Sequence, residues 1–437
     1  MNSLPPEAQP VLSRDVRLLF TTRIVRLFAY GLVSVVLVLH LAAAGLSESQ
    51  IGLLLTLTLL GDAAISLWIT TRADRAGRQR MLLLGALLMI LAGALFASTR
   101  SFWLLLLAAT FGVISPSGNE VGPFLAVEQA ALAQAIPAER RTGVFAWYNL
   151  AGSLATAFGS LCGGALADGL QGSGVSALGS YRALAAAYAV LGVGLAVLFL
   201  RLSTGSEAPK VSEPPPKVAG FHLGLATSRN KVFKLAGLFT LDSFAGGFVV
   251  QAFVAYWFQR RFGVSPSVLG AIFFGANLLA GLSALMASRV ARRIGLLATM
   301  VATHIPSNVL LFLVPLMPSL PQAITVLLLR FSISQMDVPT RQAYTMALVP
   351  AGERSAAAGV TGIARTVGAS LSPMIAGPLY ASAALASLPF LLAGGLKIVY
   401  DLLVWRTFRK AKMGEPYETI SSSSSSRRPP GRPGASE

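Results

Sequence analysis

Charged residues are scarce in this chain: Asp, Glu, Lys and Arg make up 12% of its 437 residues. A soluble domain carries roughly 25%, so the chain has too little charge to cover the surface of a water-soluble globule. Its single cysteine, Cys162, excludes an intrachain disulfide. Hydrophobic residues account for 54% of the chain. Because one membrane span needs about 20 mostly apolar residues, the composition predicts a polytopic membrane protein.

Several chemical signatures are missing as well. The sequence has no HExxH or GxSxG segment and no paired histidines, so we expect no enzyme and no metal site. It also lacks a phosphate-binding loop of the form GxxxxGK[ST], so neither ATP nor any other bound cofactor is expected as the energy source. The net charge of +17 comes from basic residues placed between apolar runs. This pattern is typical of membrane topology, and we do not expect nucleic-acid binding.

Apolar runs predict the fold. Leu27–Ser47 and Met81–Thr99 contain no charged residue, and longer runs divide at proline-containing breaks such as Met317–Gln322. We therefore expect an all-α polytopic protein with twelve transmembrane helices. They are placed near residues 20–44, 51–71, 81–98, 102–135, 143–167, 181–200, 234–259, 267–288, 296–316, 321–348, 356–381 and 387–408.

Lysine and arginine predict the orientation of these helices. If both termini are cytoplasmic, the inner segments hold 27 of the 35 basic residues and the outer loops hold four, Arg100, Arg182, Arg260 and Arg261. The positive-inside rule favours this arrangement over its reverse. We expect an integral protein of the plasma membrane with both termini in the cytoplasm.

The chain divides into two similar halves. Gly45–Gly52 (GLSESQIG) matches Gly263–Gly270 (GVSPSVLG), and Pro137–Arg141 (PAERR) matches Pro350–Arg354 (PAGER) at nearly the same offset. Such repeats typically bind substrate between the halves near the bilayer midplane. We expect a polar tail (1–16), a first six-helix bundle (17–201), a disordered cytoplasmic linker (202–232), a second six-helix bundle (233–409) and a disordered Ser/Pro/Arg tail (410–437).

One loop resembles a family signature. The segment TRADRAGRQR, between the second and third predicted helices, is similar to the motif GxxxDRxGRR/K of the major facilitator superfamily. The resemblance covers Asp74, Arg75, Gly77, Arg78 and Arg80. It implies a cytoplasmic clasp between the halves in the outward-open state, with Asp74 at the positive start of the third helix. The alternative is a tight turn that only fixes topology.

A second segment, GSLCGG, resembles the GPxxGG motif of antiporters in that family, with Ser160 in place of proline. It contains Gly159, Gly163 and Gly164, and its repeat partner SPMIAG contains Ser372, Pro373 and Gly377. Small residues at such positions allow close helix packing in lipid. A gating or leak-preventing role is the other interpretation. The resemblance as a whole is to the drug- and metabolite-efflux branch.

Charges within the predicted spans mark candidate sites, because charge is costly inside a bilayer. Arg330, Ser334, Asp337 and Arg341 are spaced 4, 3 and 4 residues apart and so share one helix face. Arg365 lies at similar depth and offers Asp337 a second arginine partner. A substrate cavity, a static buried salt bridge and a proton relay all remain open for this set.

The fourth predicted helix carries the opposing set. It contains Asn119, Glu120 and Glu128, and its Gly and Pro residues at 116–123 predict a bend. Repeat symmetry places Glu128 at the depth of Arg341. One hypothesis is that these two side chains form a gate, closed in the outward-open state and broken in the inward-open state. The alternative is that Arg341 is neutralised by Asp337, four residues before it in the same predicted helix.

Four other residue sets in the spans have weaker assignments. Asp62 is a cavity or a packing residue, Arg26 and Asp242 form a possible pair, Lys397 and Asp401 are expected to neutralise each other, and His40 and His304 are expected to be polar packing residues.

These patterns predict a secondary active transporter of a small organic solute, working by rocker-switch alternating access. We expect proton-coupled efflux (a proton antiporter), acting as a monomer in the lipid bilayer. An importer that is a proton symporter of a small metabolite, a lipid flippase and a non-transporting sensor on the same fold are the alternatives. Cavity polarity alone does not separate them.

Overall fold

A computed structural model of the chain describes residues 13–120, 122–203, 207, 225 and 227–410. All regular structure within these residues is helical, which confirms the predicted fold class. The first half contains α1 (Arg14–Ser34), α2 (Leu37–Ala43), α3 (Glu48–Ala76), α4 (Arg78–Ser98), α5 (Phe102–Phe111), α6 (Phe124–Ala135), α7 (Ala138–Gly172) and α8 (Ala177–Leu200). The second contains α9 (Arg229–Gly247), α10 (Gln251–Phe262), α11 (Pro266–Ile294), α12 (Leu296–Leu313), α13 (Leu320–Ser334), α14 (Asp337–Ala347), α15 (Arg354–Ala381) and α16 (Leu388–Phe408).

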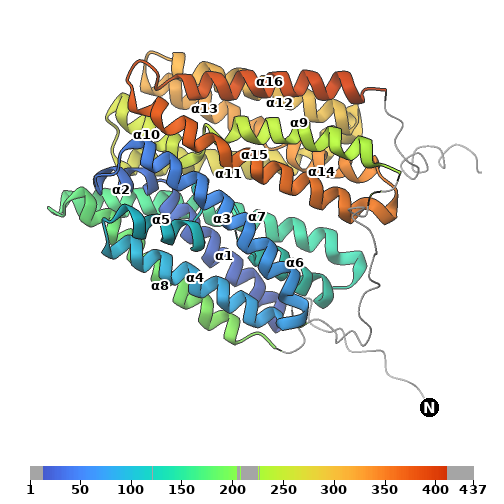
Figure 1. Cartoon of the computed structure of the whole chain (residues 1–437), viewed down its shortest axis with the longest axis horizontal. Helices are drawn as coiled ribbons and strands as arrows, with labels where there is room; N and C mark the ends of the chain where they lie inside the picture. The colour runs from blue at the N-terminus through green and yellow to red at the C-terminus, as the bar shows by residue number, and fades with distance from the viewer. Residues whose placement is uncertain (1–12, 121, 204–206, 208–224, 226, 411–437) are drawn as a thin grey trace, which may run out of the picture.

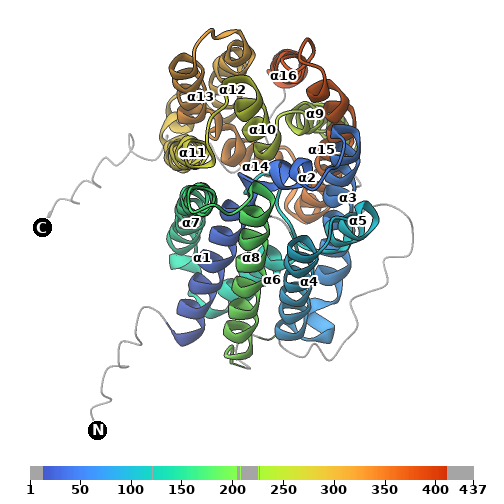
Figure 2. The same ribbon diagram turned by 90° about the vertical axis from the view of Figure 1, so that its left-hand side faces the viewer.

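The two halves form two bundles that lie one above the other, with most helices running along the long axis of the molecule (Figure 1). Figure 2 shows the molecule from the end at which α2 and α10 meet on the line between the bundles. The predicted topology places this end outside the cytoplasm. We refer to it below as the α2/α10 end.

Four of the long helical segments, called rods below, are each interrupted and so consist of two helices. The pairs α1/α2, α5/α6, α9/α10 and α13/α14 each continue one another after a gap of two to twelve residues, and α1 and α2 meet at 45°. Proline and glycine at 116–123 separate α5 from α6, as expected. When each broken pair is counted once, the described helices form twelve rods. Eight described helices are long and apolar enough to cross a membrane, or nine with α1/α2 as one span.

The observed boundaries differ from the predicted ones at two places. Helix α1 begins at Arg14, inside the predicted tail, and α9 begins at Arg229, inside the predicted linker. Most of the linker and the tail after residue 410, which were predicted to be disordered, lie outside the described residues.

The halves touch through close helix packing. Helix α3 lies against α15, and α7 lies against α11. A Cβ added at Gly164 would come within 2.2 Å of the Pro266 carbonyl oxygen, and one at Gly377 within 2.2 Å of the Glu48 carbonyl oxygen. Only glycine permits these approaches, because any side chain would push the helices apart.

Candidate functional site

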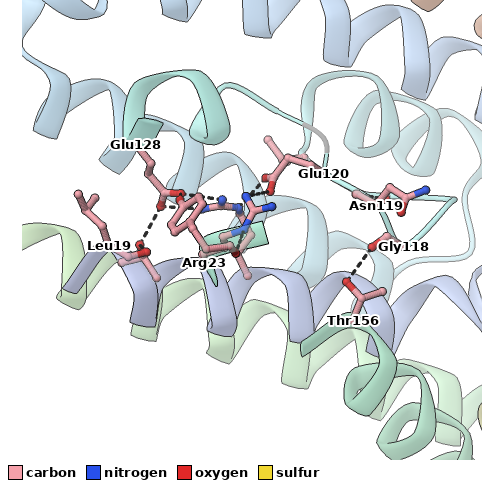
Figure 3. Close-up of polar contacts among 12 residues, drawn as sticks. Leu19, Arg23, Gly118, Asn119, Glu120, Glu128 and Thr156 are labelled. Carbon is pink, nitrogen blue, oxygen red and sulfur yellow. Dashed lines mark hydrogen bonds and ion pairs between the residues drawn. The ribbon is translucent and has the colours of Figure 1, made fainter. Parts of the chain in front are cut away.

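The first cluster lies inside the N-terminal half, where α1 faces α6 (Figure 3). Arg26 donates through both terminal nitrogens to the two carboxylate oxygens of Glu128, at 2.7 and 2.8 Å. Both side chains are completely buried. The hydroxyls of Thr22 and Tyr148 donate to the same carboxylate. Such a bidentate pair with additional donors satisfies a buried charge well.

A second arginine completes the cluster. Arg23 bonds Glu120 at 2.8 Å, the backbone carbonyl of Tyr148 at 2.8 Å and Asn149 at 3.1 Å. Glu120 also accepts from Arg26 at 2.9 Å. Two arginines therefore face two glutamates, and each glutamate is bonded to at least one arginine. Both arginines lie within α1, which begins nine residues before Arg23.

The break between α5 and α6 positions the acidic residues. Gly118 adopts φ +70, a left-handed conformation that favours glycine, and its carbonyl accepts from Thr156 at 3.2 Å. Figure 3 shows Glu120 and Glu128 pointing toward α1, with Asn119 directed away from the cluster. The Asn119 side chain is exposed. Asp62 of α3 faces the backbone N–H of Gly122 and forms no ion pair with a described residue.

The second cluster lies inside the C-terminal half and centres on Asp242 of α9. Its two carboxylate oxygens accept from Arg341 at 2.7 Å and from Lys397 at 2.5 Å. Arg341 also pairs with Asp337, one helical turn away, at 3.2 Å. All four side chains are buried. The prediction of one continuous helix face for residues 330–341 is wrong, because the helix breaks between Ser334 and Asp337. Asp337 and Arg341 of α14 are nevertheless buried in the bundle.

A histidine extends this cluster to a second carboxylate. His304 Nδ1 lies 2.8 Å from Asp401, and His304 Nε2 lies 3.8 Å from Asp242. Asn308 donates to Asp401 at 3.1 Å. Lys397 bonds Asp242 instead of Asp401, so the expected i, i+4 pair is wrong. His304 is an ion-pair partner as well as a packing residue, a role that no local spacing indicates.

Three of the predicted site residues in the C-terminal half each have one buried side-chain atom without a described hydrogen-bond partner. They are Arg330 at Nε, Ser334 at Oγ and Arg365 at Nε. Arg365 does not reach ion-pair distance of Asp337, so the second arginine partner predicted for Asp337 is not formed.

The clusters occupy equivalent places with exchanged signs. Arg26 and Glu128 join the first and fourth rods of the N-terminal half, and Asp242 and Arg341 join the corresponding rods of the C-terminal half. The expected Arg26–Asp242 pair is therefore wrong. Glu128 and Arg341 are not bonded to each other either, because each is held within its own half.

A polar seam joins the halves where the rods break. Gln251 donates to Ser34 at 2.8 Å and to Ser160 at 3.5 Å, and its side-chain oxygen accepts from Asn277 at 3.2 Å. Beside it the Ala252 N–H donates to the Pro116 carbonyl at 3.0 Å. Sequence analysis missed Gln251, because a single glutamine in an apolar run carries no distinguishing pattern.

The remaining described bonds between the halves lie nearer the α2/α10 end. Glu48 accepts from Tyr256 and Arg260, Asp168 accepts from Ser265 and Ser267, and the Met374 N–H donates to Thr56. Every hydrogen bond that the described residues make between the halves is thus at the seam or on its α2/α10 side.

The signature loop lies at the opposite end. Asp74 falls in the last turn of α3, not at the start of the third rod, and the Asp74 and Arg75 side chains lie outside the described part. The carboxylate at the start of α4 comes from Glu207 of the linker, which accepts from the N–H groups of Arg78 and Gln79 at 2.6 and 3.0 Å. Gly77 ends α3, and Arg80 is exposed.

The second motif makes packing contacts. A Cβ at Gly159 or Gly163 would come within 2.1 or 2.3 Å of a backbone oxygen of α1. In the repeat partner, Ser372 donates to the Phe244 carbonyl and the Pro373 carbonyl lies beside Gly52. Both segments thus bring helices into backbone contact.

Comparison with known families decides the relationship. The family model described as "Major Facilitator Superfamily" matches residues 19–373, most of the chain. The chain belongs to this superfamily. Membership of this superfamily indicates a secondary transporter. Among the described residues, no group of three His, Cys, Asp or Glu side chains could hold a metal ion.

The alignments with similar proteins cover nearly the whole of this facilitator chain. The "Uncharacterized membrane protein YJR124C" of Saccharomyces cerevisiae is 31% identical over 420 residues, covering 90% of this chain and 93% of that protein. A bacterial homolog of the human lysosomal transporter Spinster, inward-facing and unoccupied, has a TM-score of 0.68 at 17% identity and covers 94% of this chain and 100% of its own. A D-xylose–proton symporter has a TM-score of 0.69 at 15% identity, with 89% and 97% covered. These two structural likenesses show the fold.

Proposed function

We propose that this facilitator exports a small organic solute in exchange for protons. The observation that carries the proposal is the titratable chain Asp401–His304–Asp242 inside the C-terminal half. An imidazole between two carboxylates can take up a proton at one nitrogen and release one from the other. The D-xylose–proton symporter of the same fold is proton-coupled by its description, and the Gly159–Gly164 segment resembles that of antiporters.

The surroundings of His304 link its charge to the transport path. Lys397 and Arg341 bond the same Asp242 carboxylate that lies 3.8 Å from His304, and the Tyr400 ring packs edge-on against the imidazole. A proton on His304 would add a third cation beside Asp242 and weaken its hold on Arg341. Because Arg341 belongs to α14, the second part of an interrupted helix, protonation of His304 would act on the position of that helix.

The hydrogen bonds between the halves suggest which state this is. They lie at the seam and toward the α2/α10 end, which the positive-inside rule places outside the cell. The structure therefore supports a state closed to the outside, in which solute enters the path from the cytoplasm.

The test uses proteoliposomes with an internal pH-sensitive dye and a panel of small organic solutes. An imposed pH gradient should drive solute against its concentration gradient, and adding solute should move protons. The His304→Gln protein should keep solute exchange across the membrane at zero gradient and lose gradient-driven accumulation. His40→Gln is the matched control, because His40 is buried in α2 and has no described hydrogen-bond partner.

Accumulation that follows the pH gradient equally in His304→Gln and wild type would show that the proton path lies elsewhere. Movement of solute and protons in the same direction would contradict exchange and show that the protein is a symporter. A protein that moves no solute in any arrangement, but binds one, would support the sensor alternative.

We also propose that the protein resides in the plasma membrane as a monomer with cytoplasmic termini. A cysteine at Ser101, between α4 and α5, should react with an impermeant thiol reagent in intact cells once Cys162 is removed. One at exposed Gly352, between α14 and α15, should react only after the membrane is opened. The reverse pattern would overturn the orientation.

A further inference from the structure

The C-terminal half contains an excess of buried positive charge. Its interior carboxylates are Asp242, Asp337 and Asp401, and its interior cations are Arg330, Arg341, Arg365 and Lys397. With His304 neutral, four cations thus face three carboxylates. Asp401 is bonded to His304 and Asn308, so Asp242 and Asp337 serve the arginines and the lysine. Charge left without a counter-charge inside a bilayer is costly and points to a site.

Arg330 and Arg365 carry this excess. Neither forms an ion pair with a described residue, and the Nε of each is buried without a hydrogen-bond partner. Each interacts electrostatically with both Asp242 and Asp337. Both guanidinium groups are thus within electrostatic range of the same two carboxylates, which are bonded to Arg341 and Lys397.

The environment of Arg365 is repulsive. The charge that acts on it most strongly is that of Arg341, which has the same sign. Ser334, one turn from Arg330, adds a buried hydroxyl without a described partner. Two guanidinium groups and a hydroxyl offer N–H and O–H donors and need a negative acceptor. Planar guanidinium groups match the oxygens of carboxylates and phosphates in particular.

We propose that the C-terminal half binds the negatively charged group of the transported solute, a carboxylate or phosphate oxyanion, through Arg330 and Arg365. This inference deepens the proposed function and rests on it for the identity of the ligand as cargo. In the buried cluster of the N-terminal half, by contrast, Arg23 and Arg26 are both bonded to glutamates.

The first test needs no ligand. Replacing an unpaired buried charge removes a repulsion, so Arg330→Gln and Arg365→Gln should melt at or above the wild-type temperature in detergent. Arg341→Gln should melt lower, because it leaves Asp242 and Asp337 without their shared partner. If Arg330→Gln and Arg365→Gln fall as far as Arg341→Gln, both arginines have partners of their own and the proposal is wrong.

The second test measures binding in detergent, without a membrane or a gradient. The probes are benzoate with benzamide as its neutral match, and glucose 6-phosphate with glucose. At millimolar concentration at least one anion should raise the melting temperature of the wild-type protein, and its neutral match should not. Arg330→Gln and Arg365→Gln should each lower the affinity for that anion by about 10- to 100-fold. Arg365→Lys should retain part of the affinity, and Arg289→Gln, an exposed arginine of α11, should retain all of it.

The outcomes separate this inference from the proposed function. Neutral solutes that bind as well as the anions, or no anion that binds at all, overturn the inference whatever the flux measurements show. If Asp62→Asn abolishes anion binding as fully as Arg365→Gln, the site spans both halves and its assignment to the C-terminal half is wrong. Anion binding without proton movement keeps this inference and refutes the coupling.

Discussion

The two halves of the molecule differ in how the charges inside each helical bundle are paired. In the N-terminal half Arg23 and Arg26 meet Glu120 and Glu128, and Arg26 and Glu128 are fully enclosed. In the C-terminal half Asp242 is shared between two cations, and other cations nearby have no carboxylate.

The difference indicates a division of labour between halves of common ancestry. A saturated pair resists any rearrangement, because separating it would leave two buried charges alone. A cluster with an excess of one sign can be rearranged by a proton or an anion, since either changes the balance. We infer that the N-terminal half is the fixed frame and that the C-terminal half responds to ligands.

The largest expected effect separates the two kinds of cluster. Glu128→Gln removes the bidentate carboxylate from the fully buried Arg26 and leaves it a single bond to Glu120. It should lower the stability of the protein by about 3–5 kcal/mol. Asp242→Asn should lower it less, because Arg341 keeps Asp337. Melting temperatures in detergent measure both, with Glu48→Gln, whose ion pair with Arg260 is partly exposed, as the control near zero. Equal losses for Glu128→Gln and Asp242→Asn would remove the proposed contrast.

Charge reversals probe the same contrast through transport. Exchanging the pair within the N-terminal half, Arg26→Glu with Glu128→Arg, should recover part of the activity that either single reversal loses, because Arg23 still neutralises the neighbouring Glu120. The same exchange at Asp242 and Arg341 should recover none, because Lys397 would then face an arginine. Solute exchange in proteoliposomes, corrected for the amount of inserted protein, is the measurement.

The cross-half exchange Glu128→Arg with Arg341→Glu tests the expected gate. In this state it places like charges in both halves and should be inactive. Recovery of activity would show that Glu128 and Arg341 pair in another state of the cycle.

Smaller changes at the interface should affect closure more than folding. Gly164→Val in α7 and Gly377→Val in α15 insert a side chain where a Cβ already meets a backbone oxygen at 2.2 Å. Both proteins should insert normally and lose most transport, since the α2/α10 end cannot close. Gly169→Val and Gly362→Val are matched controls on the same two helices, because nothing lies within 4 Å of a Cβ at either position. Transport lost equally in the controls would point to helix propensity instead.

The smallest expected effects concern two helix starts. Glu353 accepts from the N–H groups of Thr227 and Ser228 before α9, as Glu207 does from those of Arg78 and Gln79 at α4. Glu353→Gln and Glu207→Gln should each reduce stability by about 1 kcal/mol. The loss should be the larger at Glu353, which is more deeply buried. Chemical denaturation in mixed micelles can resolve such a difference, and a larger loss at Glu207 would contradict the ranking.

Much of the architecture could be predicted because it is local. The Pro and Gly residues at 116–123 correctly predict a break. The 4, 3, 4 spacing of residues 330–341 predicted one helix face, but the helix is interrupted between Ser334 and Asp337, so the four residues are divided between α13 and α14. The partners of the charges could not be predicted, since they depend on which helices meet. Lys397 and Asp401 sit one turn apart, yet each bonds a residue more than 90 positions away. Nothing in the local sequence of α1 indicates that Arg23 and Arg26 bond Glu120, which lies in the break before α6, and that Arg26 also bonds Glu128 of α6.

The bond between the Ala252 N–H and the Pro116 carbonyl has an evolutionary consequence. It joins the two halves through main-chain atoms alone, so no ordinary side-chain replacement at either position deletes it. Only a proline at residue 252 would remove the donor. Side-chain substitutions in the seam can therefore alter how readily the α2/α10 end opens while this main-chain contact persists. Related chains can in this way change the solute that they bind and still keep the contact that joins the halves.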